Sequence, residues 1–419
     1  MPLESANNNS NFDVKSMKGY HPKSMSVYDS YALVKSAGPG VEAFNFQQYI
    51  TITPSGVWIC AWTQGSTEST PDQRVVCSRS LDSGKTWGKE VIVEAASDNY
   101  KVPAWIMLFS VPHTGRVYAF YWYNYNGTGI RDGGDIFYKY SDDAGLTWSE
   151  RRYQVRVPRS AVDDIGEEMH GWNFGPFTIM PNGKPMMNYN KIRRSSMVEN
   201  NPDKWDSEVF FMEGENILSE TDPEKLLFNF YPKGDRGLFV PHPVHGQHFG
   251  QEATLVPLSG GRLLTAFRTR TGHIYYAVSK DGACTWGTPE PLRFCADGPL
   301  LKQPCASPPL KKLKDSRIVL LYHNTEADGS GWNPRHPLWI LVGRETTQCE
   351  KNGGLIFGAP KILLYNDNIP GGTFNDTEIA YPEIFEWAGR VFVSYSSKTE
   401  EIRISEIAPE LLDDFGLPG

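Results

Sequence analysis

The sequence predicts an all-β protein built as a six-bladed β-propeller. Three observations support this fold class. A unit of two strand-like runs joined by a turn, followed by a third run, recurs six times at spacings of about 45 to 75 residues. A loop of the form Ser-x-Asp-x-Gly-x-Thr-Trp closes three units. The chain of 419 residues contains 39 glycines, 30 prolines and 13% aromatic residues, which favours short strands and turns.

The first half of the chain contains three of these units. Residues 1–25 are polar and are expected to form a flexible arm, and residues 26–419 a single propeller domain. The first unit turns at Pro54-Ser55-Gly56, and the third turns at Asn182-Gly183, a dipeptide typical of tight hairpins. A strand within 27–36 would be placed to complete the last blade and remove an exposed edge.

The second half contains the other three units. The clearest is residues 251–286, where apolar residues alternate with polar ones on both sides of a Ser-Gly-Gly turn. The remaining units cover residues 305–345 and 378–407. A segment rich in Pro, Gly and His at 231–250 could hide a seventh blade, so seven blades remain the alternative. A β-sandwich is less favoured because it requires no repeated unit.

The three closing loops are predicted to be structural. They span Ser80–Trp87, Ser141–Trp148 and Ser279–Trp286, and in the last one Ala283 takes the position of the glycine. Asp and Gly suit a tight turn with local hydrogen bonds, and the Trp can bury a large apolar area between neighbouring sheets. We therefore expect none of these loops to be catalytic.

Charge and composition exclude several classes of protein. The formal net charge of -8 and the lack of a Lys/Arg run argue against a nucleic-acid partner. No apolar stretch approaches the ~20 residues that span a bilayer. The N-terminus lacks the pattern of a signal peptide, so a cytoplasmic location is expected as written; Asn-x-Ser/Thr sites at Asn8, Asn126 and Asn375 leave open a secreted protein whose signal was removed. The six cysteines show no metal-type pairing and are expected to be free thiols.

The closing loops resemble the Asp boxes, or BNR repeats, of the sialidase (neuraminidase) superfamily, and the resemblance extends over residues 46–407. Asp boxes also occur in propellers that are not enzymes. More specific matches are Glu252 before the hairpin LVPLSGGRLLTAF, Arg268 after it, Arg335 before the strand HPLWILV, and the Ala380-Tyr381-Pro382 segment of the last unit. These four positions follow the order found in sialidases.

The resemblance implies a role for each of the four residues. Tyr381 would be the nucleophile, Glu252 the base that takes its proton, and Arg268 and Arg335 the groups that hold a sugar carboxylate. A phenol with a pKa near 10 needs such a base at neutral pH, and it avoids repulsion with an anionic substrate. Guanidinium groups bind carboxylates through paired, charge-assisted hydrogen bonds. No cofactor or metal is implied.

The chain departs from the sialidase pattern in the first unit. The Arg-Ile-Pro segment expected there falls on Phe46-Gln47-Gln48, so that Gln47 or Gln48 would donate neutral hydrogen bonds in place of an arginine. Residues 63–65 likewise replace an expected Glu-x-Arg. The general acid would come from the loop QGSTESTPDQR, where Asp72 is slightly preferred over Glu68.

Other polar residues are candidates for the rim of the site. His170 and Trp172, followed by Asn173, precede the third hairpin and are candidate substrate-binding residues. Three histidines, His242, His245 and His248, occur in the 231–250 segment, but without a nearby carboxylate or cysteine they do not form a metal motif.

Three functions are compatible with this set of residues. The first is a sialidase-like exo-glycoside hydrolase that removes a terminal acidic sugar, sialic acid or a related one, from a glycan or glycoconjugate. The second is a lyase acting on a uronic-acid glycan, in which the arginines neutralise the uronate and Tyr381 or a rim histidine takes the C5 proton. The third is a carbohydrate-binding propeller without activity.

Overall fold

The structure is a computed structural model of the chain. It describes residues 23–25, 27–33, 43–68, 70–97, 101–124, 134–197, 205–243, 246–326, 334–347, 349–365 and 379–413. Asn8, Asn126, Asn375 and His245 lie outside these residues. In the described part of the chain, no helix has the length and apolar character needed to span a membrane.

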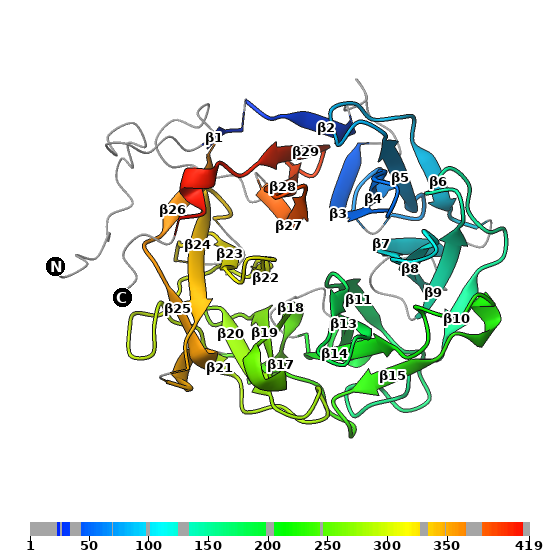
Figure 1. The fold of residues 1–419 in the computed structure, drawn as a ribbon. Coiled ribbons are helices and arrows are strands. Elements are labelled where there is room, and N and C mark those ends of the chain that lie inside the picture. Colours follow the sequence, from blue (N-terminus) through cyan, green and yellow to red (C-terminus); the bar gives the residue numbers. More distant parts are fainter. Residues whose placement is uncertain are drawn as a thin grey trace.

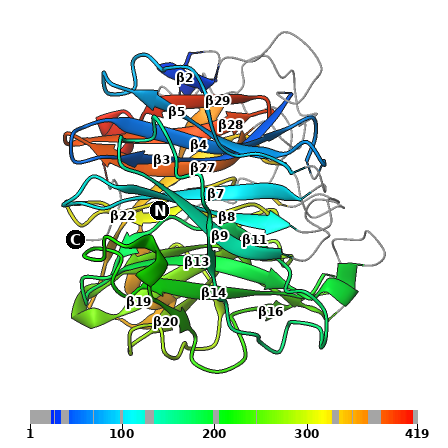
Figure 2. The same ribbon diagram turned by 90° about the vertical axis from the view of Figure 1, so that its right-hand side faces the viewer.

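Six β-sheets form a closed ring, which confirms the predicted six-bladed propeller (Figure 1). Each sheet is one blade, and the strands nearest the axis of the ring are β3 (Phe44–Ile52), β7 (Val102–Ser110), β11 (Gly171–Phe174), β18 (Gln251–Pro257), β22 (Leu310–Lys312) and β27 (Ile379–Trp387). The side view shows the blades stacked around this axis (Figure 2). The strands form from short runs rich in β-branched and aromatic residues, and Gly- and Pro-containing turns separate them.

The first three blades follow the chain in order. Blade 1 contains β3 (Phe44–Ile52), β4 (Trp58–Gly65), β5 (Arg74–Ser80) and β6 (Val91–Glu94). Blade 2 contains β7 (Val102–Ser110), β8 (Val117–Asn124), β9 (Gly134–Ser141) and β10 (Tyr153–Val155). Blade 3 contains β11 (Gly171–Phe174), β12 (Thr178–Ile179), β13 (Pro185–Ile192), β14 (Ser207–Gly214) and β15 (Phe228–Tyr231).

The other three blades complete the ring. Blade 4 contains β18 (Gln251–Pro257), β19 (Leu263–Arg268), β20 (Tyr275–Ser279) and β21 (Glu290–Pro291). Blade 5 contains β22 (Leu310–Lys312), β23 (Ile318–Tyr322), β24 (Leu338–Glu345), β25 (Leu355–Phe357) and β26 (Lys361–Tyr365). Blade 6 contains β27 (Ile379–Trp387), β28 (Arg390–Ser397) and β29 (Glu401–Glu406). Short 3-10 turns lie at η3 (Arg194–Met197), η5 (Pro223–Lys225), η6 (Ser259–Gly261), η7 (Lys351–Gly354) and η8 (Pro409–Leu411).

The 231–250 segment does not form a seventh blade. Its described part contains only β16 (Val240–Pro241) and β17 (His248–Phe249), which pair with each other. Two strands of two residues bury too little surface to make a blade of their own. The segment is held instead by blade 3, because Glu208 accepts a hydrogen bond from Gly237 N at 2.7 Å and lies 2.5 Å from Arg236 Nη1.

The N-terminal part of the chain closes the ring. β2 (Ser30–Leu33) pairs antiparallel with β29 and supplies the fourth strand of blade 6, as the strand predicted within 27–36 was expected to do. β1 (Lys23–Ser24) pairs in parallel with β26 of blade 5. The structure thus assigns a strand to residues that the sequence placed in a flexible arm, because a two-residue edge strand carries no readable pattern.

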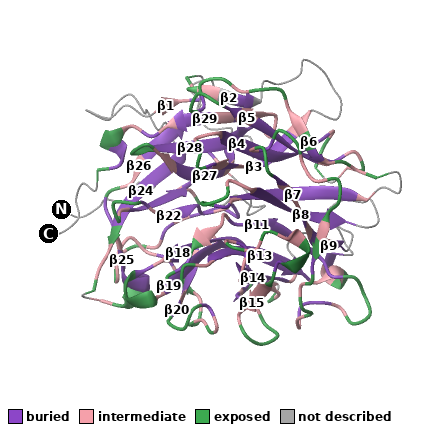
Figure 3. Cartoon of the chain, turned by 45° about the vertical axis from the view of Figure 1, so that its right-hand side comes forward, coloured by how far each residue is buried: buried purple, intermediate pink, exposed green. Residues whose placement is uncertain are grey.

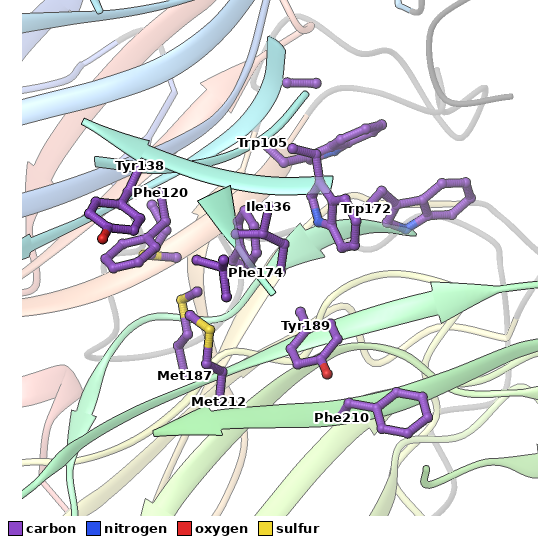
Figure 4. Packing of buried hydrophobic residues seen from close by; sticks show 14 of the residues in the cluster. Trp105, Phe120, Ile136, Tyr138, Trp172, Phe174, Met187, Tyr189, Phe210 and Met212 are labelled. Carbon is purple, nitrogen blue, oxygen red and sulfur yellow. The ribbon is translucent and has the colours of Figure 1, made fainter. Parts of the chain in front are cut away.

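Hydrophobic clusters hold neighbouring blades together, with one cluster at each of the six junctions. The burial colouring shows that the inner strands are mostly buried, that the outer strands are partly buried, and that exposed residues gather in the turns (Figure 3). The cluster between blades 2 and 3 is rich in aromatic and methionine side chains (Figure 4). Burial of this kind, at about 25 cal/mol per Å², is the main force that holds the ring closed.

The Asp-box loops are structural, as predicted. In each copy the Asp accepts hydrogen bonds from the Thr backbone N–H at 2.9 Å and from the Thr hydroxyl at 2.6 Å. The Ser hydroxyl accepts a bond from the N–H of the Gly or Ala in the fifth position. That residue is left-handed in all three loops, with φ of +83° at Gly84, +82° at Gly145 and +74° at Ala283.

The antiparallel order of the strands separates the two ends of the ring. The first strand of a blade begins at the same end where its second strand ends, and the third strand runs back to the other end. Asp boxes follow the third strands, so they lie at one end, whereas Glu252, Arg268 and Tyr381 all belong to the other. We call that second end the site end.

Candidate active site

The innermost strands of five blades share a β-bulge near their site end. Strand pairing shifts there in β3, β7, β11, β18 and β27, and one residue of each bulge is left-handed. These residues are Gln47 (φ +56°), Trp105 (φ +52°), Asn173 (φ +56°), Glu252 (φ +46°) and Tyr381 (φ +49°). None is glycine, so each bulge stores strain on the order of 1–3 kcal/mol that the surrounding fold must offset.

A bulge bends the strand and changes the direction of the side chains around it. Because the bulged strands are the innermost of their blades, the five left-handed residues form a ring of positions around the axis at the site end. The sequence prediction singled out Glu252, Tyr381 and Gln47 from this ring, and it named Asn173 as a rim residue. It missed Trp105, since nothing in a single strand sequence marks a bulge.

Glu252 and Arg268 form a buried ion pair in blade 4. Arg268 Nη1 lies 2.7 Å from Glu252 Oε2, and both side chains are 5% exposed or less. A second bond runs from Arg268 Nη2 to Gln251 Oε1 at 2.5 Å, and Gln251 is in turn held by Ser207 at 3.0 Å. Burial raises the pKa of Glu252, while the charges of Arg268 and Arg335 act in the opposite direction. Glu252 is therefore a fixed carboxyl with a pKa above its ordinary value.

Tyr381 lies within electrostatic range of this pair and is partly open to solvent. Burial raises its pKa, the carboxyls of Glu252 and Glu68 raise it further, and the two arginines lower it. The phenol is thus protonated at neutral pH and needs a base to become a nucleophile. The described side chains of Tyr381 and Glu252 are not hydrogen-bonded to each other. Such catalytic hydrogen bonds often form only when a substrate is bound.

The loop between β4 and β5 brings Glu68, not Asp72, to the other charged residues. Glu68 is solvent accessible, yet it is surrounded by enough protein that desolvation raises its pKa, and it interacts with Arg335, Glu252 and Arg268. Asp72 accepts hydrogen bonds from Ser66 N at 3.3 and 3.2 Å and from the Ser66 hydroxyl. The preference for Asp72 is not supported by this geometry, because its carboxylate is used to hold its own loop.

Arg335 belongs to the connection before β24 in blade 5. Its Nη2 donates to the backbone oxygen of Cys305 at 2.9 Å, and its guanidinium interacts with Glu68 and Glu252. Burial raises the pKa of the Cys305 thiol, whereas three surrounding arginines, Arg268, Arg270 and Arg335, lower it. Arg270 was missed by the sequence reasoning, although its position two residues after Arg268 could have drawn attention to it.

The other residues that the sequence analysis predicted to bind the substrate have buried side chains. Gln47 and Gln48 are 1% and 0% exposed, so neither side chain is open to solvent. Trp172 is 4% exposed and packs against Trp105 and Trp205, with ring centroids 5.9 and 5.1 Å apart (Figure 4). His170 is 1% exposed. These four residues thus support the walls of the site and do not stand on an open rim.

Tyr49 is a further site residue that the sequence reasoning missed. It lies in β3 and is partly exposed, and its hydroxyl donates to the backbone oxygen of Phe174 at 2.7 Å. Burial raises its pKa, and Glu383, Glu252 and Tyr381 add to this effect. A signal was present in the sequence, since a tyrosine beside two glutamines in a predicted inner strand is an unusual polar cluster.

The fold and the arrangement of its Asp boxes define a six-bladed propeller of the sialidase type. A model of the BNR repeat-like domain matches residues 56–393, which is most of the chain, and the protein therefore belongs to the family of that domain. A search of curated protein sequences finds no match.

Solved structures similar to this one include several sialidases. The Hadza microbial sialidase Hz136 is 13% identical with a TM-score of 0.62, over 88% of this chain and 66% of its own. The NanB sialidase from Streptococcus pneumoniae is 11% identical with a TM-score of 0.62, over 92% and 71%. A protein of unknown function from Dyadobacter fermentans DSM 18053 is 15% identical with a TM-score of 0.62, over 91% and 98%. At such identities the likeness establishes the fold alone.

Proposed function

We propose that the protein is an exo-acting glycoside hydrolase that removes a terminal acidic sugar from a glycan, with retention of configuration. One observation carries this proposal: Tyr381, two carboxyls of raised pKa and two guanidinium groups interact with one another at the site end of the ring. Perturbed groups that gather in this way are typical of active sites. The sialidases among the similar structures agree with the choice of an acidic sugar.

In the first chemical step, Tyr381 attacks the anomeric carbon while Glu252 accepts the phenolic proton. Glu68 donates its proton to the leaving oxygen, so that the glycosidic bond breaks as the bond to Tyr381 forms. A raised pKa suits Glu68 to this task, because the carboxyl then keeps its proton to a higher pH and can donate it to the leaving oxygen. In the second step Glu68 takes a proton from water, water attacks the same carbon, and Glu252 returns the proton to Tyr381.

Arg335 and Arg268 supply positive charge for the substrate carboxylate. Arg335 is partly exposed, whereas Arg268 is 4% exposed and already bound to Glu252 and Gln251. We therefore assign direct binding of the carboxylate to Arg335, and to Arg268 the role of keeping Glu252 ionised beside Tyr381. Removing Arg268 would leave a buried carboxyl without its charged partner.

A screen of aryl glycosides tests the proposal. 4-Methylumbelliferyl glycosides of N-acetylneuraminic acid, of its deaminated analogue and of uronic acids are incubated with the wild-type protein and with Tyr381→Phe. We expect release of the free sugar by the wild type and a loss of kcat of about 10³-fold or more in the variant, with thermal unfolding unchanged. Full activity in Tyr381→Phe would remove the mechanism. Products that absorb as unsaturated uronates would point to a lyase, and binding without turnover to a carbohydrate-binding propeller.

A further inference from the structure

Blade 1 contacts the Tyr381 strand through buried hydrogen bonds. Gln48, which is 0% exposed, donates from Nε2 to the backbone oxygen of Tyr381 at 2.5 Å. Two residues further along each strand, the N–H of Ile50 donates to Glu383 Oε2 at 2.8 Å. The ring of Phe46 lies 6.0 Å from that of Tyr381. Tyr381 and Glu383, where the bulge ends, are therefore both bound by β3.

The hydrogen bond from Gln48 binds the backbone at a strained residue, Tyr381. Tyr381 has a φ of +49°, a conformation that a residue other than glycine keeps only when its surroundings hold it. An amide side chain that is buried loses its hydrogen bonds to water. Nε2 of Gln48 regains one on the Tyr381 oxygen, whereas Oε1 has no hydrogen-bond partner among the described residues. If that bond were absent, the bulge could relax and the phenol would move away from Glu252.

The same arrangement occurs at three other bulges. Asn188 Nδ2 donates to the oxygen of Ala253, next to Glu252, at 2.7 Å. The N–H of Trp105 donates to Thr63 Oγ1 at 2.8 Å, and Tyr49 donates to the oxygen of Phe174, next to Asn173. In each case a side chain from another blade binds the backbone of a bulge. The bond from Gln48 is thus one member of a set and not an isolated contact.

We infer that Gln48 is a positioning residue for Tyr381: blade 1 uses its glutamine to hold the nucleophile, not to bind the sugar carboxylate. This inference rests on the proposed function. It assigns the carboxylate of the substrate to blades 4 and 5 alone, where Arg268, Arg270 and Arg335 lie. A positioning role requires that loss of the bond lowers kcat while KM changes little, because the groups that bind the substrate stay in place.

Two variants of Gln48 test the inference with the aryl glycoside that the wild type turns over. Gln48→Met keeps the length of the side chain but has no donor, and we expect kcat to fall about 10- to 100-fold with KM within about 3-fold of the wild type. Gln48→Glu can donate to the Tyr381 oxygen only when its carboxyl is protonated. Its kcat relative to the wild type at the same pH should therefore rise at least about 10-fold between pH 8 and pH 5.

The controls separate a positioning role from general destabilisation. Gln154→Met makes the same substitution at an exposed position in the outer part of blade 2, where the glutamine donates to Asp135 at 2.7 Å, and should leave kcat unchanged. In Gln48→Met the ratio of kcat to that of the wild type should not vary with pH. A wild-type kcat in Gln48→Met, or a pH-independent ratio in Gln48→Glu, overturns the inference while leaving the proposed function intact. Full activity in Tyr381→Phe, or no turnover by the wild type, overturns both.

Discussion

Two kinds of repeated element occur at opposite ends of this propeller, and both depend on a residue in the left-handed region. The Asp boxes repeat in sequence and in structure: Ser, Asp, Thr and Trp recur, and so do their hydrogen bonds. The bulges at the site end repeat only in structure. Their left-handed residues are a glutamine, a tryptophan, an asparagine, a glutamate and a tyrosine.

This difference separates scaffold from chemistry. Each Asp box has two consecutive left-handed residues, and in every copy one of the two is a glycine, which removes the energetic cost at that position: Gly84, Gly145 and Gly282. In the bulges the cost is retained, because the side chain at that position is needed at the axis, and hydrogen bonds from neighbouring blades hold it. A repeated backbone with varied side chains thus marks the site end of the ring, where the proposed active site lies.

The largest effect that would sharpen this comparison is expected at Glu68. Replacing it by Gln removes the proposed acid, so kcat should fall about 10²-fold for a substrate with a poor leaving group and less for an aryl glycoside. Since the pKa of Glu68 is raised, the wild type should lose activity as pH rises through that pKa and the carboxyl loses its proton. Rate–pH profiles of the two proteins measure this. An unchanged alkaline limb in Glu68→Gln would exclude Glu68 as the acid.

A smaller effect, on stability alone, is expected at the glycines of the boxes. A Cβ added at Gly84 would lie 2.7 Å from the Trp58 ring, whereas one at Gly145 would lie 3.3 Å from Ile59 Cδ1. Gly84→Ala should therefore lower the free energy of unfolding by about 2–4 kcal/mol and Gly145→Ala by about 1 kcal/mol. Chemical denaturation measures both. Equal losses of stability in Gly84→Ala and Gly145→Ala, or a reduced kcat of either folded variant, would contradict a purely structural role for the Asp-box end of the ring.

The smallest effect is expected at Asp143. Asp143→Ala removes the bonds to Thr147 and Ser141 from an exposed turn and should cost about 1 kcal/mol, with kcat unchanged. Burial opposes ionisation of Asp143, but the hydrogen bonds from Thr147 and Ser141 prevail and hold its pKa below the usual 3.8. Its contribution is therefore present above that pH and is lost as pH falls through the lowered pKa. Denaturation curves of the wild type and of Asp143→Ala, measured at decreasing pH, should therefore become the same in acid.

The scaffold could be predicted from the sequence because its signals are local. Strand-forming runs, the Asn182-Gly183 turn and the Asp-box loops each lie within a few residues, and the structure contains all of them. The strand that closes the ring was also predicted, from the need to pair an open edge.

The site was predicted only in part because its geometry is not local. Glu252, Arg268, Arg335 and Tyr381 were named from a motif, and the structure brings them within electrostatic range of one another. From the sequence, Asp72 is slightly preferred to Glu68 as the acid, but that choice depends on which carboxyl the loop itself uses for hydrogen bonding, and here it is Asp72. The hydrogen bond from Gln48 to Tyr381 joins residues 333 positions apart, and no pattern in the sequence predicts it.

The closure of the ring by β2 has a consequence for the order of folding. β2 is synthesised before any blade, yet its partner β29 is the last strand of the last blade, with Ser30 opposite Ile404. During synthesis on the ribosome, β2 must therefore remain unpaired until all six blades have been made. Pairing over such a separation is intrinsically slow, so closure should be the late step of folding and its reversal an early step of unfolding. Hydrogen exchange should then be fastest, among the blades, in blade 6.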